Sequence, residues 1–323
     1  MPLKPLRLFL AALAVLILIS CVRTSSVVRP TEMPKDLDSW LAGKEASVAG
    51  VIPASQKEIV WAGERGAKAP YSIIYIHGWQ GSSRDYEAVL QRVASELGAN
   101  VYYSRLKGYG VTTEEIVGVT LDDWINDTWE ALEIGRRLGD RVIVVGSSMG
   151  GDLALWLATR HQPDIAALVL LSCAVQPKDG NSELLLWPWP VPQILLGAVI
   201  GRYAALTFDS AKYPTGSAEL FARLYPARYR SESYLKLMAA VKLTRSLPLA
   251  GITTPSIWLY SDKDDAVNIP VLKKFYARTG GAPKRLVHVD GAHSHMLAGN
   301  VFSPETNAEV SGDIISFLRE AGL

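Results

Sequence analysis

The sequence has little cysteine and no marked excess of charge of either sign. Its 323 residues include 2 Cys, and 33 Lys and Arg balance 32 Asp and Glu to a net charge of +1. Two cysteines are too few for a disulfide scaffold. A neutral chain lacks the basic surface on which nucleic-acid binding depends, so nucleic acid is not an expected partner. With 49% hydrophobic residues, the chain is rich enough in apolar side chains to fold into a large domain.

The signatures of cofactor binding are also missing. The sequence contains no Cys-x-x-Cys pair or other zinc-ligand spacing, no Walker loop for phosphates and no glycine fingerprint for dinucleotides. We therefore expect neither a metal nor an organic cofactor.

The first 20 residues are predicted to be a targeting segment. Lys4 and Arg7 precede the apolar run Leu8–Ile19, which has the form of a secretory signal and is short for a membrane span of about twenty residues. The residues around Cys21 read Leu-Ile-Ser-Cys and resemble the bacterial lipoprotein box, in which the cysteine becomes the lipidated first residue. The alternative is an uncleaved anchor with a chance cysteine.

The lipoprotein resemblance has consequences for location. It implies a signal peptide over 1–20, an acylated Cys21 and a protein held in the bacterial cell envelope, facing the periplasm, with the membrane as a partner. Val22 stands where inner-membrane retention signals have Asp, which favours the outer membrane. Residues 21–45 are polar with scattered prolines and are predicted to be a tether.

The remaining residues, 46–323, alternate two kinds of segment. Apolar and β-branched runs that predict strands are Glu58–Trp61, Ser72–Ile76, Asn100–Tyr103, Val142–Val145, Ala166–Leu171, Ser256–Tyr260 and Arg285–Val289. Segments with helical periodicity include Asp85–Leu97, Leu121–Leu138, Asp152–Arg160 and Pro270–Arg278. Continuous apolar strands separated by helices are typical of a parallel sheet with helices on both faces, so the predicted fold class is α/β.

The alternation breaks between about 175 and 250, which we interpret as a cap inserted between two core strands. Long insertions of this kind commonly act as lids. The cap contains the apolar runs Leu184–Trp189 and Ile194–Ile200. These runs either line an acyl pocket or pack on the core as an ordinary amphipathic cap.

The clearest chemical motif is Gly-x-Ser-x-Gly at 146–150. It lies between a predicted strand, ending at Val145, and a predicted helix, beginning at Gly151. In this strand–turn–helix setting the serine sits on a strained turn that projects its hydroxyl from the sheet edge, and small flanking residues let strand and helix approach. Ser148 is therefore the predicted nucleophile. The alternative is a glycine-rich turn with no catalytic role.

A serine nucleophile needs a general base and an acid that orients the base. Of the five histidines, His293 and His295 lie in the loop after the last predicted strand. Asp262, Asp264 and Asp265 cluster after the preceding strand, which gives the chain order nucleophile, acid, base. The residues alone leave both choices open, and such an acidic cluster can also be a solvated turn.

With these features the chain resembles serine hydrolases of the α/β-hydrolase fold, of the carboxylesterase, monoacylglycerol-lipase and lysophospholipase-like kind. The resemblance runs from about Glu58 to the C-terminus. Its specific points are Ile74–Trp79, Gly146–Gly150, Asp264–Val267 and His295–Leu297. The stretch Arg105–Gly110 stands where these proteins often have Gly-His-Gly, and departs from that pattern through Tyr109.

The resemblance separates the ambiguous candidates. Family acids usually precede two residues and then Val, which selects Asp264, and family bases are often followed by two apolar residues, which selects His295. The resemblance also implies that the backbone N–H groups of Trp79 and Met149 form the oxyanion hole.

The implied reaction is hydrolysis of carboxylic esters, hydrophobic or lipid-like, through an acyl-enzyme. Thioester hydrolysis, acyl transfer and amide cleavage by the same residues are alternatives, as is a membrane-tethered binding protein that has kept the fold without catalysis. The expected partners are a small ester or lipid substrate and the membrane at Cys21. The sequence makes no prediction of oligomeric state.

Overall fold

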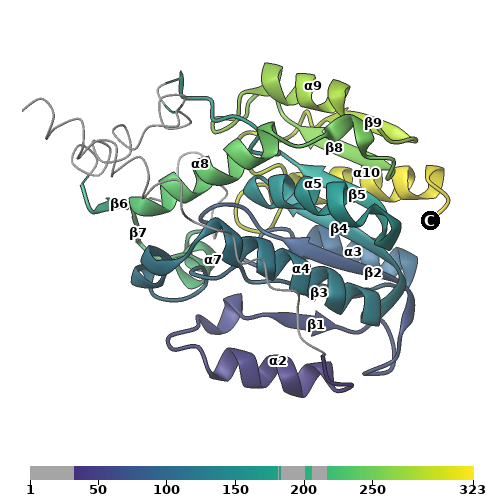
Figure 1. Ribbon diagram of the computed structural model, residues 1–323, viewed down its shortest axis with the longest axis horizontal. Helices are drawn as coiled ribbons and strands as arrows, with labels where there is room; N and C mark the ends of the chain where they lie inside the picture. Colours follow the sequence, from purple (N-terminus) through teal and green to yellow (C-terminus); the bar gives the residue numbers. More distant parts are fainter. Residues whose placement is uncertain (1–32, 181, 183–200, 206–216) are drawn as a thin grey trace, which may run out of the picture.

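The computed structural model describes residues 33–180, 182, 201–205 and 217–323 (Figure 1). A seven-stranded sheet forms its centre, in the order β1-β3-β2-β4-β5-β8-β9. The strands of this sheet are β1 (Glu58–Val60), β2 (Ala69–Ile76), β3 (Asn100–Tyr103), β4 (Gly139–Ser147), β5 (Ile165–Leu171), β8 (Ser256–Tyr260) and β9 (Lys284–His288). Every neighbouring pair is parallel except β1 with β3, which is antiparallel at one edge.

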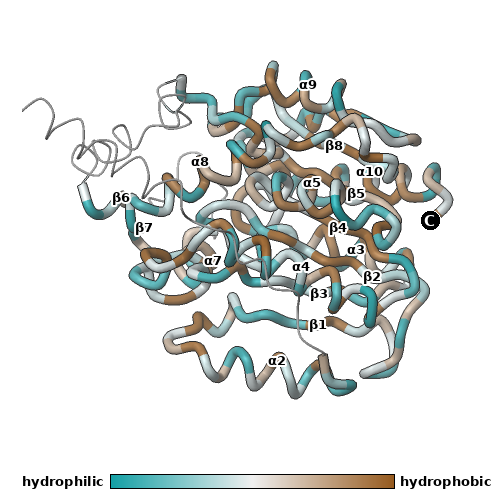
Figure 2. Tube along the Cα trace, in the orientation of Figure 1, coloured by the Kyte–Doolittle hydropathy of each residue, from teal (hydrophilic) through white to brown (hydrophobic). Residues whose placement is uncertain are grey.

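Alternate residues of the central strands enter two separate cores. In β2, Ile74 and Ile76 belong to one apolar cluster, whereas Ile73 and Tyr75 belong to the other. Because successive side chains of a strand point to opposite faces, a run that is apolar throughout needs cover on both sides. Figure 2 shows the hydrophobic residues gathered along the sheet and the helix faces turned toward it.

Helices supply that cover on both faces. The helices are α2 (Leu37–Ala46), α3 (Glu87–Leu97), α4 (Leu121–Leu138), α5 (Met149–His161), α7 (Ser217–Leu224), α8 (Glu232–Arg245), α9 (Ile269–Arg278) and α10 (Asn307–Glu320). Short 3₁₀ turns are η1 (Pro53–Ser55), η2 (Thr113–Gly118), η3 (Gln162–Asp164), η5 (Leu249–Gly251) and η6 (Pro304–Thr306). Helices α3 and α10 contribute to one core, and α4, α5 and α9 to the other. The predicted α/β class with a mostly parallel, doubly covered sheet is confirmed.

The predicted cap region lies between β5 and β8. Its described part comprises α7, α8 and a small antiparallel sheet of β6 (Tyr203–Ala205) and β7 (Arg228–Arg230). These elements gather at one end of the central sheet (Figure 1). The apolar runs Leu184–Trp189 and Ile194–Ile200 lie outside the described residues.

The N-terminal boundary differs from the predicted one. Residues 21–45 were expected to be a tether, but α2 occupies the second part of this range, and Met33, Leu37 and Leu41 are buried in the core. Glu45 also pairs with Arg105, with Oε1 2.7 Å from Nη2. Only two of the ten side chains of α2 are buried, so the face by which the helix docks is narrow. The folded body therefore includes residues from 33 onward.

The predicted targeting segment, residues 1–20, and Cys21 lie outside the described residues. Among the helices that the structure describes, none combines the length and apolar character that crossing a bilayer requires.

Candidate active site

Three loops bring the predicted site residues to the carboxyl ends of the parallel strands. Ser148 follows β4, Asp264 follows β8, and His295 lies in the loop after β9. Ser148 and His295 line one cavity of about 420 Å³, and cap residues such as Tyr225 and Leu237 also line it. Open α/β sheets bind their ligands in a crevice at the carboxyl ends of the strands, which is where this cavity lies.

The turn at Ser148 is strained and tightly enclosed. Ser148 has φ 52° and ψ −119°, a conformation that residues with a Cβ rarely adopt. Its N–H donates to Leu171 O at 2.8 Å, and its carbonyl accepts from Gly151 N at 2.9 Å, which fixes the turn on both sides. A Cβ at Gly150 would lie 2.0 Å from Ile76 O, so only glycine permits this approach of helix to strand.

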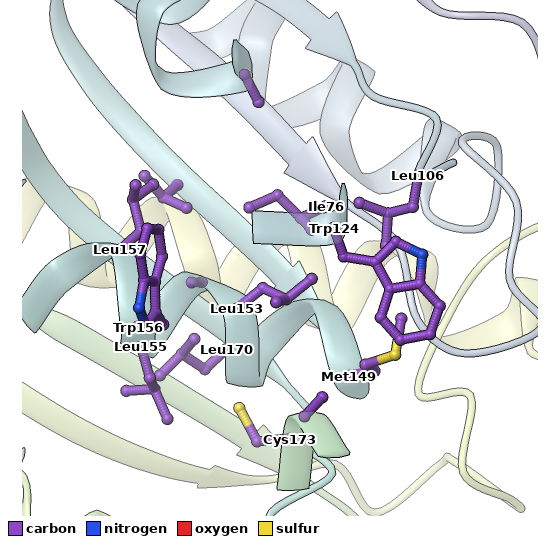
Figure 3. Close-up of a cluster of buried hydrophobic side chains, with 14 of the residues drawn as sticks. Ile76, Leu106, Trp124, Met149, Leu153, Leu155, Trp156, Leu157, Leu170 and Cys173 are labelled. Atoms are coloured by element: carbon purple, nitrogen blue, oxygen red, sulfur yellow. The ribbon is translucent and has the colours of Figure 1, made fainter. Parts of the chain in front are cut away.

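The helix that follows Ser148 is anchored in the core. Leu153 and Leu157 of α5 are fully buried. Figure 3 shows Met149 pointing toward the indole of Trp124, with Cys173 close to the same helix. Ser148 is thus held at the junction of two rigid elements, with its side chain at the cavity.

An imidazole–carboxylate pair stands in the same region. His295 Nδ1 lies 2.9 Å from Asp264 Oδ2. The second oxygen of Asp264 accepts from the backbone N–H groups of Ala266 and Val267, each at 2.8 Å. Asp264 is 0% exposed. The carboxylate is therefore fixed from behind and presents one oxygen to the ring.

The pKa values of the pair are shifted in opposite directions. Burial lowers the pKa of His295, but the nearby carboxylates, Asp264 first among them, outweigh burial and raise it above the ordinary value. Burial raises the pKa of Asp264, but the His295 charge and the hydrogen bonds that the carboxylate accepts leave it lowered overall. Each partner thus favours the charged form of the other.

The structure separates the candidates that the residues alone left open. The His293 side chain is 57% exposed, and its nearest carboxylate is Glu305 at 3.9 Å. Asp262 is exposed and interacts with His288 and Lys273 on the surface. Asp265 accepts from the backbone N–H of His295 at 3.1 Å, whereas Asp264 meets the ring nitrogen.

Ser148 and His295 share the cavity without a direct bond. In the part of the chain that the structure describes, no hydrogen bond joins Ser148 Oγ to the imidazole. Nucleophile and base are often farther apart without substrate than in the reacting complex. The catalytic roles of Ser148, Asp264 and His295 therefore stay predictions.

The loop after β2 brings the predicted oxyanion donor Trp79 to the cavity. Gly78 O accepts from Gly81 N at 3.1 Å and lies 2.9 Å from His77 Nδ1. His77 Nε2 accepts from Leu106 N, so Nδ1 carries the proton, and burial lowers the pKa of His77 to about 4. Because a peptide is planar and trans, fixing the Gly78 carbonyl also fixes the opposite direction of the Trp79 N–H.

The two predicted oxyanion donors lie next to the Ser148 turn, one in the loop after β2 and one at the start of α5. A Cβ at Gly78 would lie 2.9 Å from Ser148 Cβ, so this turn packs directly on the nucleophile. Met149 N–H is the first of α5, which leaves it without an intrahelical acceptor. Neither the Trp79 nor the Met149 backbone N–H donates a hydrogen bond within the described ranges.

Several residues that line the cavity were not predicted from the sequence. Asp85 is buried and accepts from Ser82 N at 3.1 and 3.0 Å, and from the Tyr225 hydroxyl. Burial raises the pKa of Asp85 to about 7. Phe221 and Phe302 add aromatic walls. No motif marks these positions, because the cavity is closed by contacts between distant segments. No set of three metal-ligating side chains is found among the described residues.

Comparison with known proteins gives a family and several relatives. Residues 67–300 match the family model described as serine aminopeptidase, S33. The chain is 26% identical over 198 residues to a thermostable monoacylglycerol lipase of Bacillus sp. (strain H-257), covering 61% of this chain and 72% of that protein. It is 28% identical over 162 residues to a proline iminopeptidase of Clostridium botulinum, covering 49% of this chain and 53% of that protein, about half its length.

A solved structure is similar over most of the chain. A structure reported for the metagenome-derived lipolytic enzymes LipS and LipT superposes with a TM-score of 0.68 at 18% identity, covering 84% of this chain and 99% of that one. This likeness confirms the predicted α/β-hydrolase fold.

Proposed function

The chain belongs to the hydrolase family described as serine aminopeptidase, S33, and on that premise we propose that it is a serine hydrolase acting on carboxylic esters. One observation carries the proposal. The strained turn of Ser148 opens on a cavity that also holds an imidazole bound to a buried carboxylate, His295 with Asp264. This is the arrangement in which a serine hydroxyl becomes a nucleophile at neutral pH.

The proposed reaction has two steps. His295 Nε2 takes the proton of Ser148 Oγ while Oγ bonds to the ester carbonyl carbon, and the carbonyl electron pair moves to oxygen. Asp264 holds the ring with Nδ1 protonated and stabilises its cation. The backbone N–H groups of Trp79 and Met149 receive the oxyanion. The C–O bond then breaks, His295 gives its proton to the leaving alcohol, and water repeats the sequence on the acyl-enzyme.

The cavity favours a hydrophobic or lipid-like ester. Its lining includes the apolar side chains of Phe221, Leu237, Met296 and Phe302. A volume of about 420 Å³ falls within the usual range of small-molecule sites. The similarity to a monoacylglycerol lipase supports the same substrate class.

An amide is the second candidate substrate, because the proline iminopeptidase relatives are named for peptide cleavage. Thioester hydrolysis and acyl transfer use the same residues. Matched p-nitrophenyl esters, aminoacyl amides and thioesters separate these reactions by their kcat/KM. The ester proposal requires the ester to be turned over fastest when leaving groups of similar pKa are compared.

Labelling with a fluorophosphonate probe tests the proposal directly. The wild-type protein should bind one probe, at Ser148, and Ser148→Ala should abolish both labelling and ester turnover. The neighbouring serine gives a matched control, since in Ser147→Ala the probe should still attach to Ser148. A wild-type protein that resists the probe, with and without detergent, would support a binding protein without catalysis.

The envelope location is a separate part of the proposal. We expect Cys21 to carry acyl chains and the folded body to face the periplasm from the outer membrane. Radiolabelled palmitate should enter the wild-type protein and the Cys173→Ala variant, since Cys173 is buried, and should be absent from Cys21→Ala. Label that persists in Cys21→Ala would refute the anchor and leave the hydrolase proposal intact.

A further inference from the structure

Side chains of the cap bind the loop that presents the Trp79 N–H. The Tyr229 hydroxyl donates to Gln80 O at 2.9 Å. The Trp79 indole N–H donates to Ser233 Oγ at 3.2 Å. The Tyr225 hydroxyl donates to Asp85. All three contacts join residues 225–233 of the cap to residues 79–85, across 140 or more positions of the chain.

The loop needs this support because its backbone is strained. Gln80 has φ 56°, in the left-handed region that residues with a Cβ rarely occupy. Residues 77–86 form no regular strand or helix, so no sheet ladder holds them in place. Gln80 directly follows Trp79, and a change in its φ would turn the Trp79–Gln80 peptide, which is joined through the Trp79 Cα to the peptide that carries the Trp79 N–H. The hydrogen bond from Tyr229 fixes the carbonyl of the strained residue itself.

The cap residues that make these contacts are themselves anchored. Ser233 is fully buried, as is Val241 farther along α8, which packs on α5. Tyr225 stacks on Phe221, with ring centroids 4.9 Å apart, and meets Phe302 edge-on at 5.7 Å. Arg230 joins the cap to Glu114 on the body. This part of the cap is therefore docked firmly enough to hold the loop.

We propose that the cap segment 225–233 positions the oxyanion loop, so that Tyr229 and Ser233 are positioning residues for acyl transfer as well as parts of a cover. The inference rests on the proposed function, because it assigns a role to the Trp79 N–H in that reaction. A cover that only controls entry changes substrate binding. A cap that sets the direction of an oxyanion donor changes the transition state, and therefore kcat.

The test removes single hydroxyl groups from the cap. Tyr229→Phe and Ser233→Ala each delete one hydrogen bond to the loop and keep most of the packing. With p-nitrophenyl acetate, a small substrate that needs little pocket, each variant should lose about 5- to 50-fold in kcat, less than the 10²- to 10³-fold cost of removing an oxyanion donor outright. KM should stay within about twofold.

A second measurement separates positioning from general damage. A trifluoromethyl ketone forms a tetrahedral adduct with the serine, so its inhibition constant should rise in parallel with the fall in kcat/KM across the variants. The control is Tyr203→Phe, which deletes a different cap-to-body hydrogen bond, to Glu114, between two residues that do not line the cavity. It should retain wild-type kcat and inhibitor affinity.

The outcomes are distinct. Unchanged kcat in both variants, a rise in KM alone, or an equal loss in Tyr203→Phe would overturn the positioning role while the wild-type enzyme remains active. Absence of ester turnover and of probe labelling at Ser148 in the wild type would instead overturn the proposed function.

Discussion

Two segments that line the cavity, the turn at Ser148 and the loop at Gln80, have similarly strained backbones that are stabilised by different contacts. Ser148 and Gln80 have nearly equal positive φ values, 52° and 56°. Ser148 is fixed by backbone hydrogen bonds inside the sheet core, to Leu171 and Gly151. Gln80 is fixed by a side chain from the cap, Tyr229. The nucleophile turn thus depends on the packing of β4 and α5, whereas the loop at residues 77–86, which holds the predicted oxyanion donor Trp79, is also supported by a segment of the cap.

The largest expected effect concerns the imidazole on the nucleophile side. His295→Ala should lower kcat by about 10⁴–10⁶, the scale seen when one member of a catalytic triad is removed. The matched variant His293→Ala should change kcat by less than about threefold, because its exposed ring contacts no residue of the pair. Steady-state kinetics with a p-nitrophenyl ester measure both. Equal, mild losses would remove His295 as the base.

The second prediction tests the rigidity of the nucleophile turn. Gly150→Ala places a methyl group where Ile76 O lies 2.0 Å away, so we expect unfolding free energy to fall by about 3 kcal/mol or more. Gly312→Ala in α10 is the control, because its Cβ would meet nothing within 4 Å. That variant should be neutral or gain up to about 1 kcal/mol from helix propensity. Chemical denaturation gives both values.

Hydrogen exchange sharpens the contrast between the two sides. Residues held by the cap should exchange faster than those held by the sheet, since local opening there breaks fewer contacts. In Tyr229→Phe, peptides covering 78–85 should exchange about tenfold faster than in the wild type, and peptides covering 147–157 should not change. Mass spectrometry of the digested protein measures the deuterium uptake of both sets of peptides in one experiment. An equal increase of the exchange rate in both sets of peptides would show that the two regions open together, and would contradict the contrast.

The smallest effect is on pH dependence. The base must be neutral, and the pKa of His295 is raised, so kcat/KM should rise with pH through a midpoint above 6.5. Asp85 contributes to this raised value. Asp85→Asn removes the negative charge that Asp85 carries when it is ionised. Because the pKa of Asp85 is itself about 7, the midpoint should move downward by less than about one pH unit. An upward movement would contradict the electrostatic coupling across the cavity.

The features that local sequence predicts are those built by local rules. Strands β3 and β8 and helix α4 have the predicted bounds, because apolar runs and amphipathic periodicity fix them without reference to other segments. The Ser148 turn is likewise readable from five residues between a strand and a helix. The selection of Asp264 and His295 needed the family resemblance, and the structure then placed these two side chains together.

The unpredicted features depend on contacts between distant residues. The hydrogen bond from Tyr229 to Gln80 spans 149 positions, and neither residue belongs to a motif. Helix α2 was missed because its ten residues carry a weak amphipathic signal, and its docking depends on Leu37, Leu41 and the ion pair with Arg105. Such tertiary contacts override what a short window of sequence favours.

If Cys21 is acylated, the burial of Met33 beside α2 limits the length of chain between the lipid anchor and the folded body. About a dozen residues separate the acylated position from the first buried side chain, and even fully extended they span at most roughly 40 Å. The tether would then keep the folded body within roughly 40 Å of the lipid surface. Esters that partition into the bilayer, or leave it slowly, would meet the enzyme far more often than esters dissolved in the surrounding fluid.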